Sequence, residues 1–155
     1  MGLYENMKTS PKLESEGIWL DLDHTRIKLG RAGGKNSKYV QALEKIMREY
    51  KRGIDQLSNE QSTKLFSKLY AETIVFDWLT KDESGDLDEL GRAFSVDGLR
   101  YTRGISGPDG DIIEPTVVNI TQTLLDIPDL QMMIKQTVED ASLYRAALVE
   151  SIAGN

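Results

Sequence analysis

The feature that most constrains the fold is an alternation of apolar and polar residues on both sides of the dipeptide Asp23-His24. In the stretch GIWLDLDHTRIKLGRAGG, apolar side chains recur at every second position, which is the period of a half-buried β-strand. A two-residue turn at Asp23-His24 places Leu20 opposite Ile27 on one face and Asp21 opposite Arg26 on the other. Because a shift of one residue would destroy these pairs, we predict a β-hairpin in this register.

The same stretch contains the pattern D-x-D-x-T, residues 21–25, in which haloacid-dehalogenase-like phosphatases carry their nucleophile. In such an enzyme Asp21 would attack phosphorus and Asp23 would be the general acid, at the end of a parallel strand in a doubly wound sheet. No series of strands and crossover helices follows this stretch. We therefore prefer the hairpin and keep a magnesium-dependent phosphatase as the enzyme alternative.

The composition excludes several classes of functional site. A length of 155 residues predicts one domain, and with no cysteine and one histidine the chain has no disulfides, cysteine-ligated zinc, thiol nucleophile or multi-histidine metal site. The glycine cluster at residues 30–34 lacks the spelling of a phosphate-binding loop, and DESGDLDELGRA lacks the glycine and glutamate of a calcium loop. We therefore expect no metal, no cofactor and no enzymatic activity.

Residues 1–16 are polar and carry both signs of charge, which predicts a flexible N-terminal arm before a single domain at 17–155. No run approaches the roughly 20 apolar residues of a membrane-spanning helix, so we expect a soluble protein of the cytoplasm without a membrane partner. Residues 79–104 are acidic and rich in glycine, and we expect them to form a loop insertion in this domain.

The remaining chain is predicted to be mainly helical, giving an α+β fold of about four helices, an N-terminal hairpin and a second small hairpin around Asp109-Gly110. One helix starts after Asn36 or Ser37. Ser58-x-x-Gln61 is a capping box that opens another helix, which we expect to extend through Trp78. Thr116 caps a third helix, and Pro128 begins a last one whose apolar stripe runs to Ile152.

The charge is distributed unevenly along the chain. Up to Lys81 there are 14 basic and 11 acidic residues, and beyond it 5 and 14, giving a formal net charge of −6. The acidic balance, with a pI near 4.9 and no regular interleaving of aromatic and basic residues, does not favour a nucleic-acid partner. We instead expect a protein-binding surface made by basic residues of the first helix and apolar residues of the last. Our candidate partner-binding residues are Lys45, Arg48, Lys51, Arg52, Leu130, Met133 and Ile134.

The order of several motifs resembles the small tail assembly chaperones of long-tailed, siphovirus-type bacteriophages. The corresponding motifs are the hairpin exit RIKLGRAG at residues 26–33, YAETIVFDW at 70–78, the turn Asp109-Gly110, and LDIPDLQMMI at 125–134. The resemblance covers residues 17–145, with a departure at 79–104, where this chain carries its acidic insertion. None of these motifs is catalytic, and the match rests on their order.

The resemblance implies a non-enzymatic role in virion assembly. Such chaperones coat the tape measure protein in the host cytoplasm and are displaced when tail tube protein polymerises around it. The expected partners are therefore the tape measure and tail tube proteins of the same phage. The opposed charges of the two parts of the chain would either favour self-association or meet within one monomer. A structural tail or neck component retained in the virion is the alternative.

Overall fold

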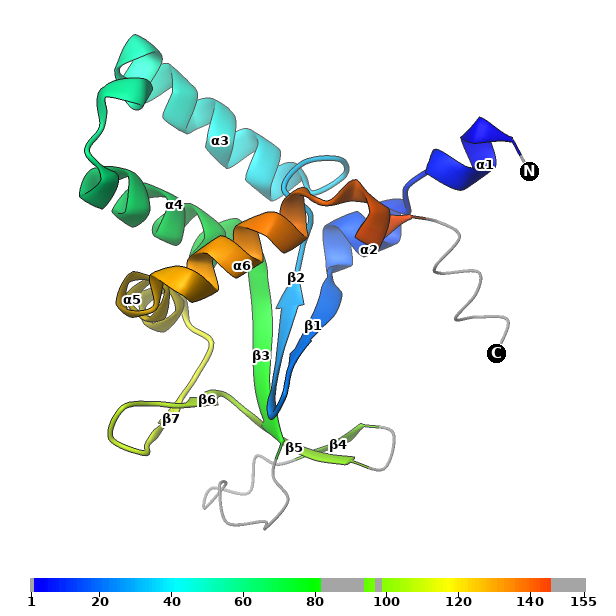
Figure 1. Cartoon of the computed structure of the whole chain (residues 1–155), viewed down its shortest axis with the longest axis vertical. Helices are drawn as coiled ribbons and strands as arrows, with labels where there is room; N and C mark the ends of the chain where they lie inside the picture. Colours follow the sequence, from blue (N-terminus) through cyan, green and yellow to red (C-terminus); the bar gives the residue numbers. More distant parts are fainter. Residues whose placement is uncertain (1, 82–93, 97–98, 146–155) are drawn as a thin grey trace.

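The computed structural model describes residues 2–81, 94–96 and 99–145, and it has an α+β fold in which helices pack against an antiparallel sheet (Figure 1). The α-helices are α1 (Leu3–Met7), α2 (Pro11–Glu16), α3 (Ser37–Tyr50), α4 (Asn59–Thr73), α5 (Val117–Asp126) and α6 (Pro128–Glu139). Two 3-10 helices follow α3 and α6, namely η1 (Lys51–Gln56) and η2 (Ala141–Tyr144). The strands are β1 (Ile18–Leu22), β2 (Thr25–Leu29), β3 (Val75–Lys81), β4 (Phe94–Val96), β5 (Leu99–Arg103), β6 (Ile105–Ser106) and β7 (Ile112–Ile113).

The predicted class is thus confirmed, with six α-helices in the described residues in place of about four. The two additional helices, α1 and α2, fall in the predicted N-terminal arm.

The predicted hairpin is confirmed in its register. Strands β1 and β2 are antiparallel, with Leu20 opposite Ile27 and Asp21 opposite Arg26. Asp23, in the turn, has a φ of 57°, the left-handed conformation that two-residue hairpin turns require. The hairpin forms one edge of a five-stranded sheet of order β1-β2-β3-β5-β4, in which all pairs are antiparallel. A parallel doubly wound sheet, which the phosphatase interpretation requires, is not what these strands form.

The prediction that a helix extends through Trp78 was wrong, because α4 ends at Thr73 and β3 begins at Val75. Strand β3 is the centre of the sheet, between β2 and β5. Trp78 lies opposite Ile27 and is 1% exposed, and its indole nitrogen donates to the carbonyl of Ile113 at 2.9 Å. The run of β-branched and aromatic residues around Val75 suits a buried strand once β2 is beside it.

The core lies between the sheet and α4, α5 and α6, which cover one face of it (Figure 1). The core residues are buried and apolar and come from both layers: Ile27, Leu29, Tyr39, Leu69, Tyr70, Ala71, Ile74, Val75, Trp78, Ile120, Leu124, Ile134 and Val138. The alternation that predicted the hairpin therefore separates a core-facing side from a side with Trp19, Asp21, Arg26 and Lys28.

Three predicted helix starts are confirmed. Ser58 and Gln61 form both bonds of the capping box. The side chain of Thr116 accepts a hydrogen bond from the backbone N–H of Asn119, and Pro128 is the first residue of α6. These signals are local, since each depends on residues within one helical turn.

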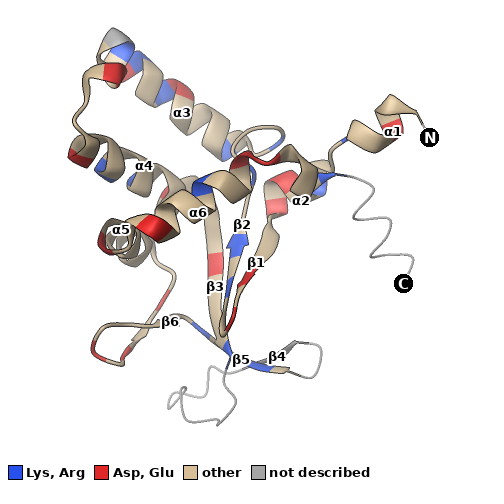
Figure 2. Ribbon diagram, viewed as in Figure 1, with Lys and Arg blue, Asp and Glu red and all other residues tan. Residues whose placement is uncertain are grey.

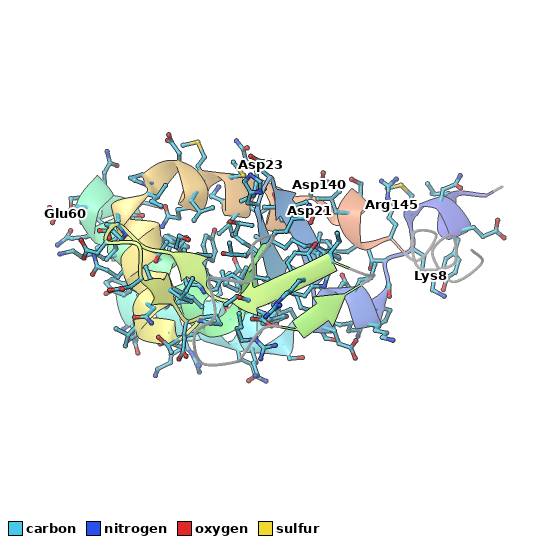
Figure 3. All side chains as sticks on the ribbon, turned by 90° about the horizontal axis from the view of Figure 1, so that it is seen from below. Lys8, Asp21, Asp23, Glu60, Asp140 and Arg145 are labelled. Carbon is cyan, nitrogen blue, oxygen red and sulfur yellow. The ribbon has the colours of Figure 1, made fainter. Side chains whose placement is uncertain are left out.

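The chain from Thr9 on packs against the rest of the protein, in contrast to the flexible arm expected over residues 1–16. Glu14 of α2 is 2% exposed and forms an ion pair with Arg31, while the N–H of Ser10 donates to the carbonyl of Tyr144 at 2.7 Å. The bridge between Thr9 and Arg145 joins the two ends of the described chain, and Figure 3 shows Lys8 and Arg145 at the same end of the molecule.

The second small hairpin is confirmed as β6 and β7, joined through a turn in which the N–H of Gly110 donates to the carbonyl of Gly107. The last helix is shorter than predicted, because α6 ends at Glu139, and the stripe residues Leu148 and Ile152 lie outside the described residues. Most of the predicted insertion also lies outside them. The two ends of the predicted insertion at residues 79–104 belong to strands β3 and β5 of the sheet. No helix in the described chain has the length and apolar character needed to cross a membrane.

Candidate partner-binding surface

The basic candidates lie at the C-terminal half of α3 and just after it, and Figure 2 shows the basic residues of this helix in blue. Lys45 and Arg48 are exposed on α3, and Lys51 is its C-terminal cap with a φ of 46°. Arg52 lies in η1, and its side chain is outside the described part of the structure. Within the described residues, Lys45, Arg48 and Lys51 form no ion pair, so their charges are available at the surface beside the exposed side chain of Met47.

The three apolar candidates on α6 differ in how far their side chains are exposed. Ile134 is 1% exposed and belongs to the core, so this predicted partner-binding side chain is not open to a partner in this structure. The prediction was based on the apolar stripe of the C-terminal helices. The described part of this stripe lies mostly in the core, since Leu124 and Val138 are also buried. Leu130 is half-buried, and Met133 is 41% exposed.

Leu130 forms a wall of an open groove, which we call the apolar groove, of about 350 Å³. The groove lies between the tip of the β1–β2 hairpin, strand β6 and the junction of α5 with α6. Its lining is Leu22, His24, Thr25, Ile27, Thr80, Ile105, Ser106, Ile127 and Leu130. Ile127, the residue between α5 and α6, is 46% exposed, so an apolar side chain remains open to a partner at one wall.

Met133 lies on the same side of α6 as the groove residue Leu130, whereas its neighbour Met132 does not. At about 100° per residue, Met133 is about 60° from Leu130 around α6, whereas Met132 is about 160° from it. Gln131, on the other flank of Leu130, donates to Thr63 and Ser67 of α4 at 3.1 and 2.9 Å. The flank of α6 that carries Met133 is therefore the one turned away from α4. Met132 and Met133 thus form a matched pair of exposed methionines on different sides of one helix.

The structure does not bring the two groups of candidates together. The C-terminal half of α3 and the tip of the hairpin lie at opposite ends of the molecule, with α4 and α6 between them (Figure 1). A partner that contacts both would have to follow the length of the protein. The basic residues and the apolar groove are therefore two separate surfaces, where the sequence predicted one.

The D-x-D-x-T residues have the environment of an exposed hairpin. The carboxylate of Asp21 accepts from the Arg26 guanidinium at 2.6 Å and its side chain is 70% exposed, while that of Asp23 is 91% exposed. The guanidinium of Arg26 also lies 4.9 Å from the ring centre of Trp19. Among the described residues, no group of three or more histidine, cysteine or acidic side chains is arranged to hold a metal ion.

Comparison with known proteins adds no relative: no protein-family model, curated protein or solved structure matches this chain.

The sequence did not predict the residues that join Leu130 in the apolar groove. Leu22 and Ile27 are core-facing residues of the hairpin, and Ile105 belongs to a strand of two residues. Only the packing of the hairpin tip against the α5–α6 junction places these side chains around one space. Their apolar character alone would assign all of them to the core.

Proposed function

We propose that this chain is a non-enzymatic tail assembly chaperone of a long-tailed bacteriophage. It binds the tape measure protein in the host cytoplasm, keeps it soluble, and gives way when tail tube protein polymerises around it. The order of the motifs over residues 17–145 supports the family. The observation that carries the binding role is the apolar groove, with Ile127 exposed at its wall. Met133 is exposed on the flank of α6 next to Leu130, a residue of that wall.

The groove favours an apolar helix face of the tape measure protein as its occupant. An amphipathic helix presents side chains at three- and four-residue spacing, and a groove between a hairpin and a helix junction accepts such a ridge. Burial of one leucine-sized side chain contributes about 1.5–3 kcal/mol. The exposed charges of Lys45, Arg48 and Lys51 would then act at a distance, by increasing the rate of encounter with acidic segments of the same partner.

Co-expression with the tape measure protein of the same phage tests the proposal. We expect the tape measure protein to be soluble with the wild-type chain and to precipitate with Met133→Asp, because aspartate introduces a charge into an apolar contact. Met132→Asp is the matched control and should keep the partner soluble. Both methionines are exposed, so both variants should retain the wild-type circular dichroism spectrum.

Three further outcomes are informative. Arg48→Glu with Lys51→Glu should weaken the effect at low salt and have less influence at high salt, where surface charges are screened. A tape measure protein that precipitates equally with and without the chain would contradict the proposal. Equal loss with Met132→Asp and Met133→Asp would show that the apolar groove is not the binding surface.

A further inference from the structure

A second groove lies at the end of the sheet where β2 leaves and β3 begins, between α2, the 30–36 loop and the start of α3. This groove, which we call the lysine groove, has a volume of about 530 Å³. It is lined by Ser15, Glu16, Lys28, Lys35, Ser37, Lys38 and Phe76. None of these residues belongs to the apolar groove or to the basic cluster at the end of α3.

The half-buried ring of Phe76 gives the lysine groove an apolar surface. Between Lys28 and Leu29 the register of β2 with β3 shifts, so Phe76 is an extra residue in β3. Its ring lies directly over the backbone of Gly30, where a Cβ atom would be 2.5 Å from the ring. Any side chain at residue 30 would therefore displace Phe76.

The charges around this ring are mainly positive and unpaired. Three lysines line the groove against one acid, Glu16. In the described part of the chain Lys35 and Lys38 form no ion pair, and the ammonium of Lys28 lies 5.7 Å from the ring centre of Trp19.

The start of α3 adds to this positive potential. Asn36, the N-cap residue, turns its side chain inward, where its amide donates to the carbonyls of Arg31 and Thr73 at 2.9 and 3.0 Å. That side chain therefore does not cap the first N–H groups of α3, which keep their partial positive charge. An acidic segment with an apolar residue would complement both the lysines and Phe76.

The chain itself carries such a segment. Residues 82–90, DESGDLDEL, contain five acids, two leucines and no basic residue. They follow Lys81, at the opposite end of β3 from Phe76, so the length of a strand, about 20 Å at 3.3 Å per residue, separates their attachment point from the groove.

We propose that the lysine groove binds residues 82–90 of a second copy of this chain. The groove and the attachment point of the segment at Lys81 lie at opposite ends of β3, so the contact is head-to-tail and leaves an unoccupied groove and an unbound segment on every dimer. Further copies then add in a row. The proposal rests on charge and geometry alone and holds or fails independently of the proposed function.

Mixing two charge-reversed variants tests this contact. The wild-type chain should associate in a concentration-dependent way at low salt, as measured by light scattering. Lys35→Glu with Lys38→Glu, and separately Asp86→Lys with Asp88→Lys, should each weaken association by roughly tenfold or more, because two exposed ion pairs are lost and replaced by repulsion. The 1:1 mixture of the two double variants contains one intact segment and one intact groove, so the two variants together should form a dimer at concentrations where each variant alone stays monomeric.

Lys64→Glu with Lys68→Glu is the matched control, since these exposed lysines of α4 lie outside the groove, and it should associate like the wild type. Three results would overturn the proposal: a wild-type chain that stays monomeric at low salt, association unchanged by the groove variant, or no dimer in the mixture. The last would show that the segment binds within its own chain or elsewhere.

Discussion

Replacement of Arg31 by alanine should destabilise the fold far more than replacement of an exposed ion-pair partner. The carboxylate of Glu14 is 2% exposed and pairs with Arg31, whose side chain is 23% exposed. Gly34, at a φ of 54°, brings its backbone against the same carboxylate. Arg31→Ala leaves a buried charge without its counter-ion, which typically costs 3–5 kcal/mol. Because water reaches part of the site through the exposed fraction of Arg31, we expect about 3 kcal/mol.

The matched control is the exposed pair of the hairpin. Asp21 is 70% exposed, so Asp21→Asn should cost only about 0.2–1 kcal/mol. A second variant separates charge from packing. In the double variant Glu14→Gln with Arg31→Ala, the buried group is a neutral amide, and we expect this variant to be more stable than Arg31→Ala alone by about 1 kcal/mol or more.

Urea unfolding followed by tryptophan fluorescence measures these differences, since Trp78 is buried in the core. With a slope of about 1–3 kcal/mol per M, Arg31→Ala should lower the midpoint by about 1–3 M. A midpoint within about 0.3 M of the wild type would refute the reasoning. It would mean that α2 does not hold Glu14 against Arg31 in solution, and that residues 9–16 are the mobile arm expected from the sequence.

Three further predictions concern the tyrosines, the hairpin and the sheet. Burial raises the pKa of Tyr39, Tyr70 and Tyr144, so they should ionise after the other tyrosines in a spectrophotometric titration. Because the folded chain then keeps tyrosine protons that the unfolded chain loses from about pH 10, the contribution of these tyrosines to stability should be fully present below that pH and lost above it; stability that does not fall between about pH 10 and 12 would contradict this. Asp21→Asn should leave partner solubilisation intact, and magnesium-dependent hydrolysis of an aryl phosphate that this substitution abolishes would overturn the hairpin interpretation. The amides of Tyr101 and Thr102 in β5 should exchange slowly, because both residues are buried beside β3, and exchange as fast as that of α1 would show that β5 is not part of the stable sheet.

Features specified by neighbouring residues could be predicted from the sequence. The register of the hairpin follows from the alternation around Asp23-His24, and the capping box depends only on Ser58 and Gln61. Thr116 and Pro128 likewise mark helix starts through their own backbone chemistry. Each of these signals acts within one turn of chain, so tertiary packing does not reverse it.

Features decided by tertiary packing were missed. The apolar run that starts at Ile74 is compatible with a buried helix or a buried strand. It forms strand β3 because the edge of β2 is available to pair with it, and this pairing cannot be seen in the sequence. Ile134 is part of an apolar stripe, and the stripe does not indicate that the core needs this residue while Met133 remains outside it. In the same way, the two grooves are built by residues that are far apart in the sequence.

The central claim is that this chain acts during assembly of a phage tail and is absent from the finished particle. Quantitative mass spectrometry of infected-cell lysate and of washed virions, with the tail tube protein as internal reference, tests it most directly. We predict that the chain is abundant in the lysate and nearly absent from the virions. Recovery of the chain in washed virions in fixed stoichiometry with the tail tube protein would contradict the claim and would favour a structural component of the tail or neck.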